Sequence, residues 1–296
     1  MKKLVISLIL ALSLLPASAS ALQMPGFGSG GTEMDLGYTA KAYVVIDVNT
    51  GKVLVQKNAE TLWPPASLTK LVTAMVVLDL KPKLTKTVAM AKADEVGGAR
   101  LATKAGVKYT LRDLLYASLV ASTNNGINAS ARSTGLSREK FVERMNQKAK
   151  DLGATQTVFY EPSGIDEKNQ TTADDYAKIA AAAYKYPLIA DAASRQTYSL
   201  TATNNRRYSH NLKNTNKLLG DSDFSFLGKT GYLEESQYNF ASLVEDLSGN
   251  KLAVVVLGSQ NSSTQFKEAR ELAALGHLMK SFDTVSSAVL GTSVKN

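Results

Sequence analysis

Sequence patterns typical of β-strands occur toward both ends of this 296-residue chain, and a helical stretch separates them. The run Val48-Asn49-Thr50-Gly51 supplies turn-forming residues between the first two patterns and predicts a hairpin. Strands so distant in sequence bury their apolar faces only by pairing in one sheet. The strand patterns lie at residues 42–47, 52–56, 197–200, 207–212, 237–245 and 251–258.

Helical patterns fill the middle and the end of the chain. They lie at residues 111–121, 137–152, 172–186 and 265–282. Another helix is expected from Ser67, because apolar residues follow at helical spacing and Pro64-Pro65 excludes a helix just before it. The predicted fold class is therefore α/β (α+β). We expect one mixed sheet flanked by helices, a helical subdomain at about residues 85–195, and a cleft at their seam.

Three short motifs follow one another along the chain: Ser67-Leu68-Thr69-Lys70, Ser122-Thr123-Asn124 and Lys229-Thr230-Gly231. Only Lys-Thr-Gly is unique in the sequence, so order and structural context must identify the other two. The competing serines have plainer interpretations as a helix N-cap, a hairpin turn or strand residues, and they are Ser137, Ser209, Ser248 and Ser259. Ser122 instead follows an apolar helix and precedes small residues, which predicts a short loop facing the cleft.

The Ser-x-x-Lys spacing places Ser67 and Lys70 on one face of a helix, about one turn apart. A lysine accepts the serine proton only when it is neutral, and burial beside a second cation such as Lys229 would lower its pKa. The helix N-terminus adds backbone N–H groups where an oxyanion would develop. Ser67 is therefore the candidate nucleophile.

Lys229-Thr230-Gly231 precedes the strand pattern at residue 237, so we expect it at an inner edge facing Ser67. An ammonium and a hydroxyl suit a substrate carboxylate, and Gly231 lets a substrate backbone approach closely. A metal site is not expected, since His210 and His277 are the only histidines and neither belongs to a ligand-spaced cluster. No cofactor motif occurs, and the scattered basic residues do not indicate nucleic-acid binding.

The N-terminus has the layout of a secretory signal peptide, with Lys2 and Lys3, an apolar run and small residues up to Ala21. We expect a signal at residues 1–21, a linker at 22–38, the folded domain at 39–282 and a tail at 283–296. The mature protein would be periplasmic or otherwise extracytoplasmic. With no cysteine it has no disulfides. The net charge of +8 falls to +6 once Lys2 and Lys3 are removed with the signal, and it would suit peripheral association with a membrane or with anionic wall polymers.

The three motifs resemble those of the penicillin-binding DD-peptidases, most closely the low-molecular-mass D-alanyl-D-alanine carboxypeptidases and endopeptidases. The resemblance extends over roughly residues 40–280. Beyond the motifs it rests on Ala42-Tyr43-Val44-Val45-Ile46-Asp47, Pro64-Pro65-Ala66, Glu161-Pro162-Ser163-Gly164, Asn214-Thr215-Asn216 and Tyr238-Asn239-Phe240. It implies a DD-peptidase/β-lactamase-like fold, peptidoglycan stem peptides as substrates and β-lactam antibiotics as covalent inhibitors.

The resemblance also implies a role for each site residue. Ser67 would form the acyl-enzyme, Lys70 would activate it, and Ser122 would pass a proton to the leaving D-alanine. Asn124 would bind a substrate amide, and Lys229 with Thr230 would bind the terminal carboxylate. The backbone N–H groups of Ser67 and Tyr232 would form the oxyanion hole.

Two departures from the family pattern stand out. The residue after Asn124 is often aspartate in the carboxypeptidases but is Asn125 here. The sequence after Gly231 leaves no room for the extra β-domain and amphipathic anchor of many carboxypeptidases, so we expect a compact DD-peptidase. Carboxypeptidase and endopeptidase activity both remain open.

Two other functions are alternatives. A class A β-lactamase shares two of the motifs, and Glu161 lies near the position of its deacylating glutamate, although the surrounding class pattern is missing. A non-catalytic module that binds the cell wall or senses β-lactams is the second alternative. It is disfavoured because no catalytic residue is missing from the motifs.

Overall fold

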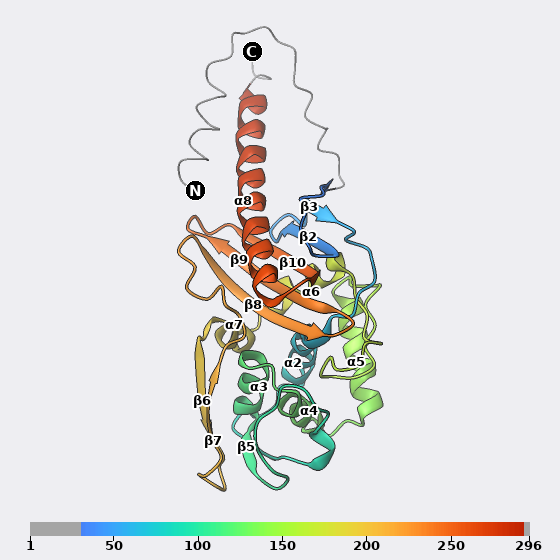
Figure 1. Ribbon diagram of the computed structural model, residues 1–296, viewed down its shortest axis with the longest axis vertical. Coiled ribbons are helices and arrows are strands. Elements are labelled where there is room, and N and C mark those ends of the chain that lie inside the picture. The colour runs from blue at the N-terminus through green and yellow to red at the C-terminus, as the bar shows by residue number, and fades with distance from the viewer. Residues whose placement is uncertain (1–30, 293–296) are drawn as a thin grey trace.

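The computed structural model describes residues 31–292, with side chains up to residue 282 (Figure 1). The predicted signal peptide and residues 22–30 of the predicted linker lie outside the described residues. The helices and strands form a central sheet with helices on both faces, and a predominantly helical part lies below it in Figure 1. The expected α/β class with a mixed sheet is thereby confirmed.

The central sheet has six strands in the order β1-β3-β2-β10-β9-β8. Its strands are β1 (Thr32–Glu33), β2 (Ala42–Asp47), β3 (Val53–Lys57), β8 (Phe224–Leu233), β9 (Gln237–Asp246) and β10 (Lys251–Ser259). β1 pairs with β3 in parallel and the other neighbours are antiparallel. The pairing of β2 with β10 joins the two ends of the chain, as the strand patterns predict. β8 forms one edge of the sheet.

Both faces of the sheet are buried, which explains why residues 42–47 read as one apolar run. Alternate side chains enter separate cores, because successive residues of a strand point to opposite faces. Val45 and Val254 pack toward α8 (Ser262–Thr292), whereas Val44 and Val255 belong to the core that also holds residues of α2 (Lys70–Asp79) and α6 (Ala173–Ala183). The middle of the sheet therefore stabilises both layers.

The part between β3 and β8 contains most of the helices. Its elements after the short 3-10 helix η1 (Ala66–Thr69) and α2 are β4 (Thr87–Ala89), η2 (Lys92–Asp94), β5 (Lys108–Thr110), α3 (Leu111–Val120), α4 (Asn124–Arg132), α5 (Arg138–Asp151), α6, α7 (Pro187–Ser194), β6 (Thr197–Thr201) and β7 (Ser209–Lys213). The side chains of Thr110, Ser137 and Thr172 cap α3, α5 and α6 by accepting from backbone N–H groups.

Several boundaries differ from the sequence-based expectations. The loop expected at Ser122-Thr123-Asn124 holds only Ser122 and Thr123, because Asn124 already begins α4. The small residues of α4 allow close packing: a Cβ on Gly126 would lie 2.7 Å from Ser118 Oγ. Lys229-Thr230-Gly231 lies in the edge strand β8, which precedes β9 and which the strand patterns did not include. Strands β6 and β7 form a separate two-stranded sheet, and Pro187 starts α7 because proline is compatible with the first turn of a helix.

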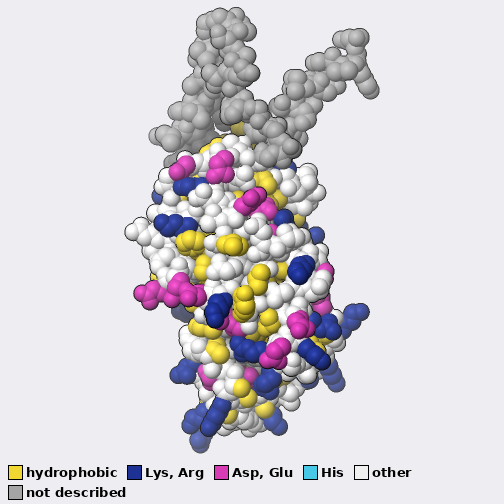
Figure 2. Space-filling model, turned by 90° about the vertical axis from the view of Figure 1, so that its right-hand side faces the viewer, with side chains coloured by type: hydrophobic (Ala, Val, Ile, Leu, Met, Phe, Trp, Pro, Cys, Tyr) yellow, Lys and Arg dark blue, Asp and Glu magenta, His cyan; other side chains and the backbone are white. Residues whose placement is uncertain are grey.

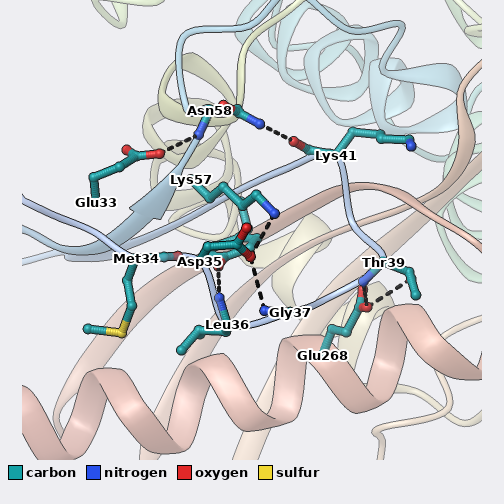
Figure 3. A network of polar contacts seen from close by, with 11 residues as sticks. Glu33, Met34, Asp35, Leu36, Gly37, Thr39, Lys41, Lys57, Asn58 and Glu268 are labelled. Atoms are coloured by element: carbon teal, nitrogen blue, oxygen red, sulfur yellow. Dashed lines mark hydrogen bonds and ion pairs between the residues drawn. The ribbon is translucent and has the colours of Figure 1, made fainter.

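Residues before the expected domain start at Thr39 take part in the described fold. Thr32–Glu33 pair with β3, and the following residues run over α8, where Thr39 donates from N and Oγ1 to the buried Glu268 carboxylate at 2.5 and 2.8 Å (Figure 3). Asp35 forms an ion pair with Lys57 at 2.8 Å in the same network (Figure 3). At the other end, α8 continues to Thr292, beyond the expected helix end at residue 282. The segment from Thr32 to Thr39 therefore holds the first turns of α8 through Glu268.

Candidate active site

Ser67 lies in η1, one turn before α2, so the predicted helical position holds although the first turn is 3-10. The Lys70 side chain is fully buried, and its Nζ lies 2.7 Å from Ser67 Oγ and 2.6 Å from the carbonyl oxygen of Ser163. The Ser163 carbonyl accepts one amine hydrogen, which leaves the lone pair of a neutral amine free for the serine hydroxyl. The geometry suits proton transfer from Ser67 to Lys70.

Burial lowers the pKa of Lys70 to about 7, and the nearby Glu161 carboxylate opposes this shift. The charged form loses its hydration in the interior, which is why desolvation is the larger effect. A lysine with a pKa near neutrality is partly in the basic form required of a general base. The sequence analysis predicted a lowered pKa from burial and from a neighbouring cation, and burial is the main cause.

Ser122 lies between α3 and α4 in a left-handed backbone conformation with φ of +59°. Such a conformation is strained for a residue with a side chain and is held here by the helices on either side. The Lys229 ammonium donates to Ser122 Oγ at 2.9 Å and to the Thr230 carbonyl oxygen at 2.8 Å. Each of the two serines therefore contacts the amine of a buried lysine.

Lys229, Thr230 and Gly231 alternate between the two faces of β8. Lys229 is buried, and burial, reinforced by Lys70, holds its pKa well below the usual lysine range. Thr230 Oγ1 donates to Thr215 Oγ1 at 2.7 Å. Gly231 packs against η1, where a Cβ would lie 2.6 Å from the carbonyl oxygen of Pro65. Only glycine lets β8 approach Ser67 this closely.

Asn124 and Tyr232 lie on opposite walls of the cleft. Asn124 Nδ2 donates to the Gly97 carbonyl oxygen at 2.8 Å, while its Oδ1 is buried without a hydrogen-bond partner among the described residues. An unpaired buried acceptor suits a substrate N–H group. Tyr232 is half exposed, and the centroid of its ring lies 4.5 Å from the ring centroid of Tyr238.

A cavity of about 450 Å³ joins these residues. The predicted site residues on its wall are Ser67, Ser122, Asn124, Thr230, Gly231 and Tyr232, and Lys70 and Lys229 lie buried behind the two serines. Residues from three distant segments of the chain thus meet in one cleft between β8 and the helices. The structure therefore brings together the candidate site residues of all three motifs.

The sequence profile of the D-alanyl-D-alanine carboxypeptidase family matches residues 31–261. The chain belongs to this family. A D-alanyl-D-alanine endopeptidase of Pseudomonas aeruginosa is 30% identical over 276 residues, which cover 92% of this chain and 88% of that protein. The carboxypeptidase DacF of Bacillus subtilis is 31% identical over 263 residues, which cover 87% of this chain and 66% of that protein.

Solved structures agree with this assignment. A Streptomyces DD-transpeptidase superposes with a TM-score of 0.77 at 26% identity, and the match covers 83% of this chain and 99% of that protein. The family and its fold confirm the resemblance drawn from the motifs.

Glu161 has a structural environment that does not suit a deacylating base. Its buried carboxylate accepts from Ser163 N at 2.7 Å, Ser163 Oγ at 2.5 Å and Ile165 N at 2.9 Å, and also from Gly164 N. These bonds hold the turn that directs the Ser163 carbonyl toward Lys70. Glu161 is not on the cleft wall, so the site argues against a class A β-lactamase.

Asn125, the departure from the family pattern, is not among the residues that line the cleft. Its side chain is buried, donates from Nδ2 to Glu95 Oε1 at 2.8 Å and accepts from Leu101 N at 2.9 Å. It therefore anchors residues 95–101, whose Gly98 and Ala99 line the cleft beside Asn124. Because Nδ2 supplies a donor to a carboxylate, asparagine fits this position better than aspartate.

The sequence did not single out some contacts of the site. Thr215 contacts Thr230, and the Ser163 carbonyl contacts Lys70; both lie in segments that the family resemblance marked without assigning them a role. The described residues contain no group of three or more His, Cys, Asp or Glu side chains placed to hold a metal ion. The two histidines pair elsewhere, His210 with Tyr109 and His277 with Asp246.

Proposed function

We propose that the chain is a serine DD-peptidase that cleaves peptidoglycan stem peptides after a D-alanine through an acyl-enzyme on Ser67. The observation that carries the proposal is the Ser67–Lys70 pair, with 2.7 Å between Oγ and Nζ and a lysine pKa of about 7, in the cleft that also holds Ser122. Family membership supplies the substrate class.

In the first half-reaction, Lys70 takes the proton of Ser67 while Oγ attacks the D-alanyl carbonyl carbon. The backbone N–H groups of Ser67 and Tyr232 would stabilise the oxyanion. The carbon–nitrogen bond then breaks, and Ser122 donates its hydroxyl proton to the leaving amine while it receives the proton held by Lys70, so both residues return to their starting forms. Water hydrolyses the ester in the second half-reaction, which releases the acyl group and restores the Ser67 hydroxyl.

The leaving group is held by its carboxylate in this proposal. Thr230 lines the cleft, and the buried Lys229 ammonium lies behind the cleft wall beside Ser122 Oγ and the Thr230 carbonyl oxygen. Charge-assisted hydrogen bonds to a carboxylate are strong when desolvated. Asn124 Oδ1 offers its unpaired oxygen to an amide N–H of the substrate. A β-lactam presents a reactive carbonyl and a carboxylate at similar spacing, so it should acylate Ser67 and inhibit.

The location follows from the substrate. Peptidoglycan lies outside the cytoplasmic membrane, and residues 1–21 have the sequence layout of a secretory signal, so we infer export to the periplasm or wall. None of the helices within residues 31–292 combines the length and the apolar character needed to cross a membrane. Lys and Arg side chains gather toward the lower end of the face shown in Figure 2, which would suit contact with anionic wall polymers.

A labelled penicillin tests the proposal. It should attach covalently to the wild-type protein and not to Ser67→Ala, and Lys229→Ala should slow attachment because the carboxylate loses its cation. Labelling of both wild type and Ser67→Ala would disprove the nucleophile assignment. Rapid hydrolysis of a chromogenic cephalosporin that depends on Glu161 would instead favour the β-lactamase alternative, and labelling without peptide cleavage would favour a sensing module.

A further inference from the structure

The two ends of the cleft serve different parts of a bound peptide. In the proposed mechanism the acyl carbon lies at Ser67 and Tyr232, and the leaving-group carboxylate lies at Lys229 and Thr230. The direction along β8 from Tyr232 to Thr230 is therefore the direction from the acyl donor to the leaving group. Anything attached to the leaving group beyond its carboxylate must lie past Thr230, on the side of Thr215.

Lys217 lies on this leaving-group side. It follows Thr215 by two residues, lines the same cavity and is exposed. Its backbone is held in place: Thr215 N donates to the Val120 carbonyl oxygen at 3.0 Å, and Asn216 Nδ2 donates to the Phe226 carbonyl oxygen at 3.0 Å. The lysine is thus an exposed side chain on a fixed stretch of backbone.

The charge of Lys217 is not used within the described part of the protein. No residue there forms an ion pair or hydrogen bond with its ammonium group, and among the residues that line the cavity it is the one charged side chain. The bound terminal carboxylate already has Lys229 and Thr230 as partners. A cation beyond that point is suited to a second carboxylate, farther along the leaving group.

A single D-alanine has no second carboxylate, because the chain ends at the group that Lys229 and Thr230 hold. A cross-linked substrate differs: its leaving amine belongs to the diamino acid of a second stem peptide, which carries further free carboxylates, including its own C-terminus. We propose that Lys217 binds a carboxylate of this second stem peptide and so directs the enzyme toward cross-linked peptidoglycan. The inference rests on the proposed DD-peptidase function and specifies its substrate.

The test compares two substrates with one set of variants. Purified cross-linked muropeptide dimer and uncross-linked pentapeptide are incubated with wild type, Lys217→Gln, Lys217→Arg and Lys213→Gln, and kcat/KM is measured for each pair by mass analysis of products. Lys213 is the matched control, because it is an exposed lysine on the adjacent strand β7 and does not line the cavity. Penicillin acylation of each variant is followed in parallel.

We expect Lys217→Gln to lower kcat/KM for the dimer about tenfold more than for the pentapeptide, equivalent to about 1.4 kcal/mol. Lys217→Arg should restore most of the loss, higher salt should reduce the wild-type preference for the dimer, and Lys213→Gln should behave as wild type. Equal losses on the two substrates, or no loss on the dimer, would overturn the inference. A wild type that cleaves only pentapeptide would also overturn it while leaving the DD-peptidase function intact. Absence of both labelling and cleavage would refute that function itself.

Discussion

Gly164 is the residue whose replacement tests most directly how the fold positions Ser67. It has φ of +82°, and a Cβ there would overlap the carbonyl group of Ala66 and lie 3.0 Å from Ser67 N. Ala66 itself has φ of +50°, so the backbone before the nucleophile is already in a strained region. The substitution Gly164→Ala therefore displaces the peptide that carries Ser67.

The expected magnitude has two parts. A left-handed conformation costs an L-residue about 1–2 kcal/mol, which lowers the stability of the protein. Relieving the overlap requires the Ala66–Ser67 backbone to move by roughly 1 Å, and a misplacement of that size at a reacting group reduces rates about 10²-fold. Gly164→Ala should thus lose about 2.7 kcal/mol of transition-state stabilisation in acylation.

The chain provides a matched control at Gly106. Its φ is +86°, close to that of Gly164, but a Cβ there would meet nothing within 4 Å. Gly106→Ala should show the conformational cost without the displacement, so its thermal unfolding should shift by a few degrees and that of Gly164→Ala by at least as much. The assay is the second-order rate constant for labelling by a fluorescent penicillin. Wild-type labelling by a folded Gly164→Ala would refute the argument, as would an equal loss in Gly106→Ala.

Other predictions concern the groups around the nucleophile. Because burial lowers the pKa of Lys70 to about 7, the neutral base is present above that pH and is lost below it, so the acylation rate should fall about tenfold per pH unit below 7; a flat profile from pH 5 to 8 would contradict this. Glu161→Gln should weaken the charge-assisted bonds to its backbone donors and lower the free energy of unfolding by about 2–4 kcal/mol, as chemical denaturation would measure. Asn125→Asp places a second carboxylate against Glu95, so its melting temperature should fall at pH 7 and recover in acid, whereas a pH-independent difference would disprove the repulsion.

Much of the site was predictable because its chemistry depends on local spacing. Ser67 and Lys70 are one turn apart, so any helix at that point brings their side chains together. The hairpin of β2 and β3 was also predictable, because alternation and a turn signal agree there. The pairing of β2 with β10 followed from the need of two-sided apolar strands to be covered.

The contacts that were missed are set by tertiary structure. α4 was not among the expected helices, because Gly126 and its polar neighbours have weak helix propensity, and packing against α3 overrides that preference. The Ser163 carbonyl is a backbone group, so no side-chain motif predicts that it accepts a hydrogen bond from Lys70. Thr215 and Lys217 reach the cleft from a segment beside β8, a placement visible only once β8 is known to be the sheet edge.

The two buried lysines have different tasks that depend on each other. Lys70 lies against the nucleophile and Lys229 against Ser122, and a positive charge on Lys70 lowers the pKa of Lys229. When Lys70 takes the proton of Ser67, it becomes a cation in a site where a second cation is already unfavourable. Passing that proton to the leaving nitrogen relieves the repulsion, so the burial that makes Lys70 a base also favours its return to the neutral form. A site with only one of these lysines would lack the charge repulsion that favours proton loss from Lys70. We therefore expect Lys229→Ala to slow the acylation step as well as to weaken carboxylate binding.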